Sequence, residues 1–265
     1  MTASSHHVAV RVGEQICDIE YRWAGPDHAT KTLVLLHEGL GSVAMWKGFE
    51  AHIASACGAR VLVYSRPGYG RSTPRQPNEQ WGTDFMHRQA REVLPAVLDG
   101  LGIWDPVGLI GHSDGASIAL IAAAHLPDRY HRVAAMAPHT FVEDICIAAI
   151  QASRSKYTTG GLKQALSPYH DDPDSAYFGW STAWLDPEFR SWNMLDLVAQ
   201  LQQPILCIQG EDDEYGTMAQ VLSIARAAPQ TETLKLAKCG HSPHRDQPQQ
   251  VLTALAHFFR DSAAN

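Results

Sequence analysis

The sequence predicts an α/β fold, in which a mostly parallel, eight-stranded sheet is flanked by helices and carries an inserted helical cap. Two observations lead to this prediction. Short runs rich in Val and Leu, which suit strands buried on both faces, alternate with longer segments of helical character. This alternation stops between residues 140 and 200, where no good strand is evident. Strands that alternate with helices favour a wound, mainly parallel sheet with helices on both of its faces.

The individual elements follow from local patterns. Residues 8–12 and 16–21 alternate in polarity around Gly13-Glu14, which predicts a hairpin at one edge of the sheet. The other predicted strands cover residues 32–36, 60–64, 107–110, 133–137, 205–209 and 232–237. Helices are predicted over residues 43–56, 84–101 (with Pro95 as a candidate kink), 116–124, 142–154 and 251–259.

The segment without strands predicts the division into domains. Residues 1–139 and 201–265 are expected to form an α/β core, and residues 140–200 a helical cap inserted between two core strands. The cap segment is rich in aromatic residues. Most of them are expected to form its own small core, while two or three line a substrate pocket. Phe141, Trp180 and Trp184 are the candidates for substrate contacts.

Composition excludes several classes of function. Hydrophobic residues make up 45% and charged residues 18% of the 265 residues, a globular balance. A net charge of −7 and the lack of a long basic run argue against nucleic acid as a partner. The apolar runs are too short to span a bilayer, and no signal peptide is evident, which predicts a cytoplasmic protein without a membrane partner. Five scattered cysteines without a C-x-x-C pair predict free thiols in a reducing compartment. The oligomeric state stays open.

The most informative stretch is Gly111-His112-Ser113-Asp114-Gly115, a G-x-S-x-G motif between an apolar run and a small-residue helix. A sharp turn from strand to helix would lift Ser113 above the sheet edge, at a helix N-terminus where developing negative charge is favoured. Alone the motif is weak, because chance produces it in about one chain in ten of this length. A turn that merely packs a helix on a strand would read the same way.

A serine nucleophile needs a base, and the base needs an acid. Among 14 histidines, His241 is best placed, because it follows a predicted strand at the sheet edge where sites of open α/β sheets collect. His244 is its rival, although the intervening Pro243 argues against a metal-binding pair. One acid of the run Glu211-Asp212-Asp213-Glu214 could turn toward the base, and the run does not match a calcium loop. The order serine, acid, histidine fits this arrangement.

An oxyanion intermediate needs backbone donors. One donor is expected from the N–H of Asp114, directly after the nucleophile. The second is expected from the loop His37-Glu38-Gly39-Leu40-Gly41, which follows the strand at residues 32–36.

Taken together, these motifs resemble those of capped α/β-hydrolase-fold enzymes over nearly the whole chain. The resemblance implies Asp213 as the acid, with Asp212 as the nearby alternative, and His241 as the base. It also implies Gly39 as the second donor of the oxyanion hole. Glu38 departs from the family, which usually has glycine there. Its carboxylate either caps or forms a salt bridge away from the site, the favoured reading, or contacts a polar substrate group or a water.

The expected activity is hydrolysis of a small-molecule carboxylic ester through an acyl-enzyme on Ser113, His241 and Asp213, without a cofactor or metal. Hydrolysis of a carbon–carbon bond in a β-diketone-like compound, or of a thioester, would use nearly the same triad and is the alternative. A non-catalytic small-molecule receptor on the same fold is less favoured.

Overall fold

The computed structural model describes residues 5–260. Its sheet contains eight strands in the order β1-β2-β4-β3-β5-β6-β7-β8. The strands are β1 (His6–Val12), β2 (Gln15–Ala24), β3 (Thr32–Leu36), β4 (Arg60–Tyr64), β5 (Val107–His112), β6 (Tyr130–Met136), β7 (Ile205–Gly210) and β8 (Thr231–Leu236). β1 and β2 run antiparallel to their neighbours, and the remaining pairs are parallel. The predicted fold class and strand set are confirmed.

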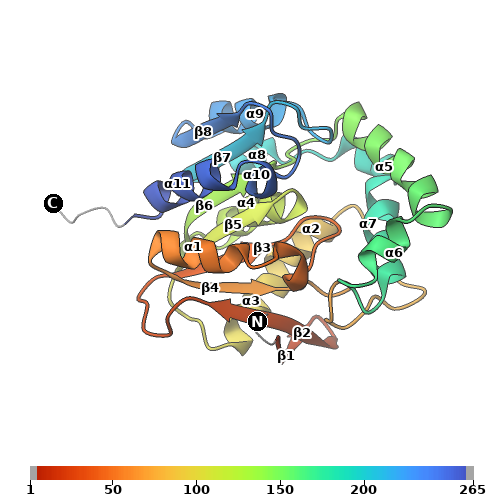
Figure 1. Cartoon of the computed structure of the whole chain (residues 1–265), viewed down its shortest axis with the longest axis horizontal. Helices are drawn as coiled ribbons and strands as arrows, with labels where there is room; N and C mark the ends of the chain where they lie inside the picture. The colour runs from red at the N-terminus through yellow and green to blue at the C-terminus, as the bar shows by residue number, and fades with distance from the viewer. Residues whose placement is uncertain (1–4, 261–265) are drawn as a thin grey trace.

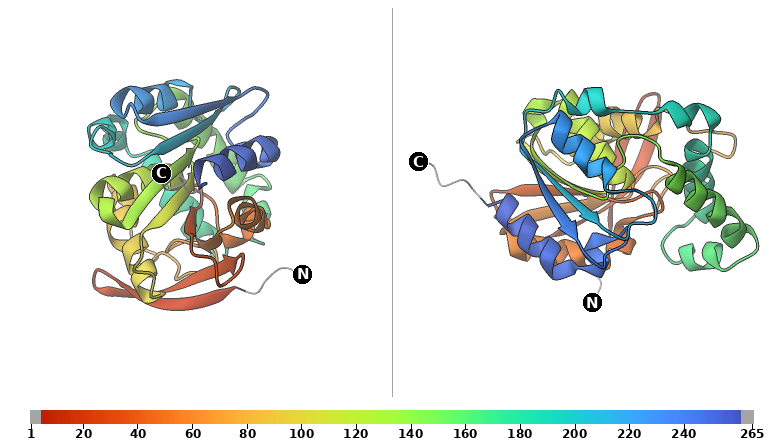
Figure 2. Two further views of the ribbon diagram at one scale, coloured as in Figure 1. Left: turned by 90° about the vertical axis from the view of Figure 1, so that its left-hand side faces the viewer. Right: turned by 90° about the horizontal axis from the view of Figure 1, so that it is seen from above.

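Helices cover both faces of this sheet (Figure 2, left). One face carries the 3₁₀ turn η1 (Val43–Trp46), α1 (Phe49–Cys57), α10 (Pro243–Asp246) and α11 (Pro248–Phe258). The other carries α2 (Phe85–Arg88), the π turn η2 (Gln89–Val93), α3 (Leu94–Gly100), α4 (Asp114–His125), α8 (Leu195–Val198) and α9 (Ala219–Ala227), with the short η3 (Pro127–Arg129) leading into β6. Each face buries its own apolar cluster. The central strands β3 and β5 are therefore covered on both sides, which explains their nearly continuous apolar sequences.

Two predicted helices are interrupted. The expected helix at 43–56 divides at Gly48, whose φ of 88° lies in the left-handed region that glycine adopts without strain. The expected helix at 84–101 contains the π turn η2 directly before α3. Pro95 has no N–H to donate to the preceding turn, so a widened turn accommodates it where a regular helix would clash.

Residues between β6 and β7 form the helices α5 (Asp144–Thr158), α6 (Leu162–Leu166), α7 (Pro173–Trp184) and η4 (Pro187–Ser191), followed by α8. Figure 1 shows α5, α6 and α7 together beyond one end of the strands, to the right of the sheet, whereas α8 lies beside the core. Trp81 packs closely against Gly68 of the core and Gly179 of α7, where an added Cβ would lie 2.6 and 2.7 Å from the indole. The domain boundaries at residues 140 and 200 stay a prediction.

Within residues 5–260, every helix is too short or too polar to reach across a lipid bilayer.

Candidate active site

Ser113 occupies a strained turn between β5 and α4. Its φ of 54° and ψ of −121° are unusual for a residue with a side chain. The turn is tight because Gly111 and Gly115 lie back to back, and a Cβ on Gly111 would lie 2.2 Å from the Gly115 carbonyl oxygen. The structure thus forms the sharp strand–turn–helix that the motif predicts, with Ser113 at its apex.

The serine meets a histidine and a carboxylate from two other loops. Its Oγ lies 2.8 Å from His241 Nε2, and His241 Nδ1 lies 2.9 Å from both carboxylate oxygens of Asp213. Because Nδ1 faces a carboxylate, it carries the proton, which leaves Nε2 to accept the hydrogen bond of the Ser113 hydroxyl. Asp212, the alternative acid, is exposed and does not contact His241.

Asp213 is held as an anion by its surroundings. Burial by itself favours the neutral acid, but hydrogen bonds from His241 and from the backbone amides of Tyr215 and Gly216 hold the pKa of Asp213 below its usual range. Gln209, the buried residue before the end of β7, donates to the second carboxylate oxygen at 2.8 Å. A carboxylate in this position holds the histidine ring in the orientation that points Nε2 at Ser113.

The backbone of His241 is fixed on both sides by residues that sequence reasoning did not single out. Glu214 accepts from the His241 N–H at 3.1 Å, and His112 Nε2 donates to the His241 carbonyl at 2.6 Å. His112 stands between Gly111 and Ser113 in the G-x-S-x-G motif. This position beside Ser113 is the sequence signal that could have identified it.

His244, the rival base, is buried, and its ring lies 5.0 Å from that of Trp46 and 4.8 Å from that of His112. It packs behind the site.

The loop after β3 approaches Ser113 as a rigid turn. The Glu38 carbonyl accepts from Gly41 N–H at 3.0 Å, from Arg66 Nη2 at 2.8 Å and from His37 Nδ1 at 2.7 Å. Burial and the nearby Arg66 guanidinium keep the pKa of His37 well below its usual value, so the ring stays neutral. Gly39 follows directly and lies against Trp180 of the cap, where a Cβ would come within 2.2 Å of the indole Nε1.

Glu38 forms ion pairs behind the loop. Its carboxylate lies 3.5 Å from His112 Nδ1 and 3.6 Å from Arg245 Nη2. Burial opposes its ionisation, but the interaction with His112, together with His244 and His37, holds the pKa of Glu38 well below its usual range. Glu38 thus pairs with Arg245 and also borders the cavity described next.

A cavity of about 110 Å³ lies above Ser113. It is bordered by the Ser113 turn, the loop after β3, the His241 loop and the helices α5 and α7, and its lining includes Glu38, Gly39, Leu40, Asp114, His139, Cys146, Ile150, Trp180, Trp184 and Tyr215. Trp180 and Trp184 both border the cavity, and their contact with substrate stays a prediction. Phe141 does not border it: its backbone bridges to Asn193, and its carbonyl accepts from Gln220 at 3.0 Å. Position next to a strand end placed Phe141 near the site in sequence, but the chain turns away there.

His139 is a further missed neighbour. It is 2% exposed, and its ring lies 5.0 Å from that of Trp184 and 5.7 Å from that of His241. Burial, with a contribution from His241, lowers the pKa of His139 to about 3, so it stays neutral beside the triad. Nothing in the sequence distinguished it from the other histidines.

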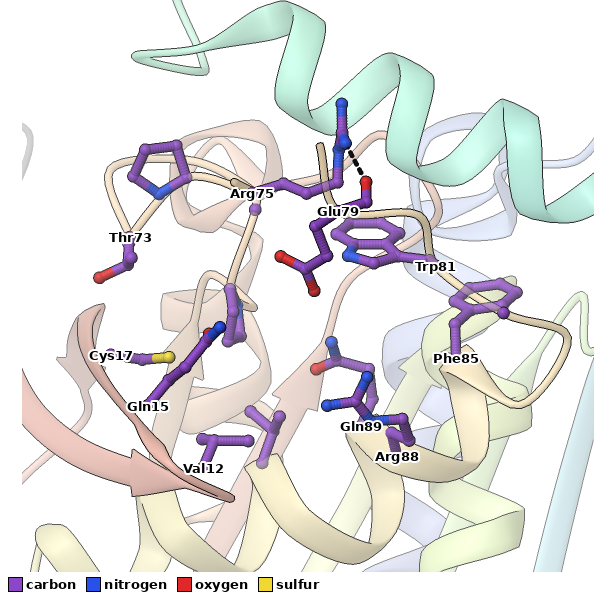
Figure 3. A pocket seen from close by; sticks show the side chains of 15 residues that line it. Val12, Gln15, Cys17, Thr73, Arg75, Glu79, Trp81, Phe85, Arg88 and Gln89 are labelled. Atoms are coloured by element: carbon purple, nitrogen blue, oxygen red, sulfur yellow. Dashed lines mark hydrogen bonds between the residues drawn. The ribbon is translucent and has the colours of Figure 1, made fainter. Parts of the chain in front are cut away.

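A separate cavity of about 60 Å³ lies between the β1–β2 hairpin, the loop at residues 73–84 and helix α2 (Figure 3). Figure 3 shows Cys17 and Gln15 on one side of it, and Arg75, Glu79 and Trp81 on the other. Burial and the nearby Glu79 raise the pKa of the Cys17 thiol, which disfavours the reactive thiolate. None of the triad residues borders this cavity.

Across residues 5–260, no group of three or more His, Cys, Asp or Glu side chains is arranged to hold a metal ion.

Known proteins share both the sequence pattern and the fold. A hydrolase from Dechloromonas aromatica, named for 2-hydroxy-6-oxononadienedioate and its nonatrienedioate analogue, is 24% identical over 97% of this chain and 98% of its own. An esterase from Thermogutta terrifontis superposes with a TM-score of 0.75 at 17% identity, covering 96% of this chain and 97% of that one. A meta-cleavage product hydrolase from Pseudomonas fluorescens superposes with a TM-score of 0.73 at 16% identity, covering 95% and 96%.

The family assignment rests on a match that spans most of the chain. Residues 33–254 match the sequence profile described as the alpha/beta hydrolase family. This range begins in β3, the strand before the loop that carries Gly39, and includes Ser113, Asp213 and His241. The chain belongs to the alpha/beta hydrolase family and is a hydrolase enzyme.

Proposed function

We propose that this hydrolase cleaves a small-molecule carboxylic ester through an acyl-enzyme formed on Ser113. The observation that carries the proposal is the unbroken chain of hydrogen bonds from Ser113 through His241 to Asp213, at the floor of a cavity. The small volume of that cavity suits a compact acyl group. The scheme uses no cofactor.

The reaction would proceed in two halves. Ser113 Oγ attacks the ester carbonyl while His241 Nε2 takes its proton, and the N–H groups of Gly39 and Asp114 stabilise the oxyanion. His241 then returns the proton to the departing alcohol, leaving the acyl group on Ser113. In the second half, water loses a proton to His241 and attacks the acyl-enzyme, and the acid is released as Ser113 regains its proton.

The first test removes the nucleophile. Ser113→Ala should lower kcat for a p-nitrophenyl ester by about 10⁴-fold or more, because no other hydroxyl within residues 5–260 hydrogen-bonds to His241 Nε2. A fluorophosphonate probe should label the wild type but not this variant, with both proteins equally folded by circular dichroism.

Ser242→Ala is the matched control, since Ser242 also borders the cavity but makes no hydrogen bond to His241 among the described residues. It should keep the fluorophosphonate label. If Ser113→Ala retained more than a few per cent of kcat, the nucleophile assignment would be wrong.

Cleavage of a carbon–carbon bond is the second candidate, supported by the names of two similar hydrolases. A thioester is a third that the same triad could serve. Parallel turnover of a p-nitrophenyl ester, a ring-cleavage product and an acyl-CoA separates the three, because only the preferred class reaches a high kcat/KM. Failure of the wild type to take up the fluorophosphonate at all would favour the receptor function.

We further propose a cytoplasmic location, with a small molecule as the partner and neither nucleic acid nor membrane involved. All five cysteines are free and buried, which suits a reducing compartment.

A further inference from the structure

Asp114 follows the nucleophile directly and is 1% exposed, yet it borders the cavity above Ser113. One of its carboxylate oxygens, Oδ1, accepts a hydrogen bond from Trp184 Nε1 at 3.1 Å. The other, Oδ2, has no hydrogen-bond partner among residues 5–260. A buried oxygen of this kind costs free energy until a donor reaches it.

Asp114 has no close ion-pair partner among the described residues. The second carboxylate that borders the cavity belongs to Glu38, and it lies within 4.0 Å of both His112 and Arg245. No basic side chain of the described residues comes that close to Asp114, and no Lys or Arg borders the cavity. In agreement, burial raises the pKa of Asp114 to about 6, although Arg66 at longer range and the Trp184 hydrogen bond act in the opposite direction.

A purely structural role does not require this charge. An amide at this position would accept the Trp184 hydrogen bond equally well and would avoid the cost of burying a carboxylate. A carboxylate with one unpaired oxygen beside Ser113 is suited to bind a cationic donor. Such a ligand supplies both the missing hydrogen bond and the missing countercharge.

We propose that Asp114 binds an amino group on the acyl part of the substrate, so that the enzyme selects esters of small amino acids over neutral or carboxylate-bearing acids. This inference rests on the proposed ester hydrolysis. Because adjacent Cα atoms are about 3.8 Å apart, the carboxylate can reach only groups close to the reacting carbonyl. The recognised amine is therefore placed on the carbon next to that carbonyl. The same two carboxylates repel an acyl group that ends in a carboxylate.

The experiment compares matched esters in one enzyme. The benzyl esters of L-alanine and of isobutyric acid differ by an ammonium group in place of a methyl group. The benzyl ester of L-lactic acid carries a neutral donor at the same position, and monobenzyl succinate carries a carboxylate. For the wild type, kcat/KM should favour the alanine ester over the isobutyrate ester by about 10- to 100-fold, the value of one charge-assisted hydrogen bond. The succinate ester should be the poorest substrate.

Asp114→Asn is the informative variant, because it preserves an acceptor for Trp184 and removes only the charge and one acceptor atom. The alanine-to-isobutyrate ratio should fall to within a few-fold of one. The ratio is the readout because it divides out any change in the absolute rate that comes from the neighbouring oxyanion hole. Glu38→Gln is the matched control, since it neutralises the other carboxylate of the cavity and should keep the ratio.

Several outcomes overturn the proposal, and they differ from failure of the ester hypothesis. Equal turnover of the alanine and isobutyrate esters by the wild type shows an esterase without an amine site, and this result needs no variant to fold. An equal loss of the ratio in Glu38→Gln shows a general field rather than a site at Asp114. Wild-type labelling by fluorophosphonate without turnover of any of the esters rejects ester hydrolysis itself.

Discussion

At Gly39 the loop after β3 lies directly against helix α7. A side chain there would overlap the indole of Trp180, with a Cβ 2.2 Å from Nε1 and 2.5 Å from Cδ1. Trp180 is itself only 7% exposed. Because Gly39 has no side chain, its backbone and the indole of Trp180 can line the same cavity.

Gly39→Ala should lower kcat for the preferred ester by about 10²-fold, because the overlap displaces a donor proposed for the oxyanion. The double variant Gly39→Ala/Trp180→Ala should lose less activity than the two single effects combined, since removing the indole removes the clash. Steady-state kinetics on the four proteins measures this coupling. Strictly additive losses would show that the methyl group acts elsewhere.

At the scale of elements, the site depends on how closely α4 crosses β3. A Cβ on Gly115 would lie 2.2 Å from the Leu36 carbonyl oxygen and 2.6 Å from that of His37. Both are backbone atoms of the central sheet and of the loop that follows it, so they cannot rotate aside. The close crossing brings the N-terminus of α4, with Asp114 as its first residue, next to the loop that carries Gly39.

Gly115→Ala should destabilise the protein by about 1–3 kcal/mol or more, because the added methyl group forces the helix and the sheet apart. Urea denaturation measures the effect. Gly161→Ala is the control, since a Cβ there meets nothing within 4 Å. Similar unfolding midpoints for both variants would contradict the close crossing.

At the scale of the whole molecule, several buried and neutral histidines lie around the site. Burial lowers the pKa of His37 and His244 well below the usual value, and that of His139 to about 3. Unfolded histidines bind a proton near pH 6.5. Between that pH and the much lower folded pKa values, the unfolded chain binds more protons than the folded one. Stability is therefore present above about pH 6.5 and falls as the pH drops below it.

The free energy of unfolding should decrease from pH 7.5 to pH 5.5, with each buried histidine contributing up to about 1.4 kcal/mol per pH unit below pH 6.5. His244 is the one to vary, because Trp46 and Phe49 surround it together with His112, Glu38, Arg245 and His241. His244→Phe should show a shallower decrease in urea titrations at the two pH values. An unchanged slope would show that His244 takes up its proton in the folded state.

Much of the fold could be predicted because its signals are local. Buried parallel strands need consecutive apolar residues, so the runs at residues 32–36 and 60–64 coincide with β3 and β4. The helix interruptions at Gly48 and before Pro95 depended on backbone geometry that a periodic pattern does not report. In the site, Gly111 and Gly115 around Ser113 and the order serine, acid, histidine could be predicted, because each lies within a short motif.

The sequence by itself determined the wound sheet and singled out Ser113 and His241 of the hydrogen-bonded triad, because each depends on residue type and on neighbours along the chain. Only the tertiary structure decided that Asp213 rather than Asp212 meets His241, that Phe141 turns away, and that Asp114 keeps one oxygen unpaired beside Ser113. These outcomes depend on which side chains distant loops bring within hydrogen-bond reach, and on the burial that results. Neither property is carried by the local pattern of residues.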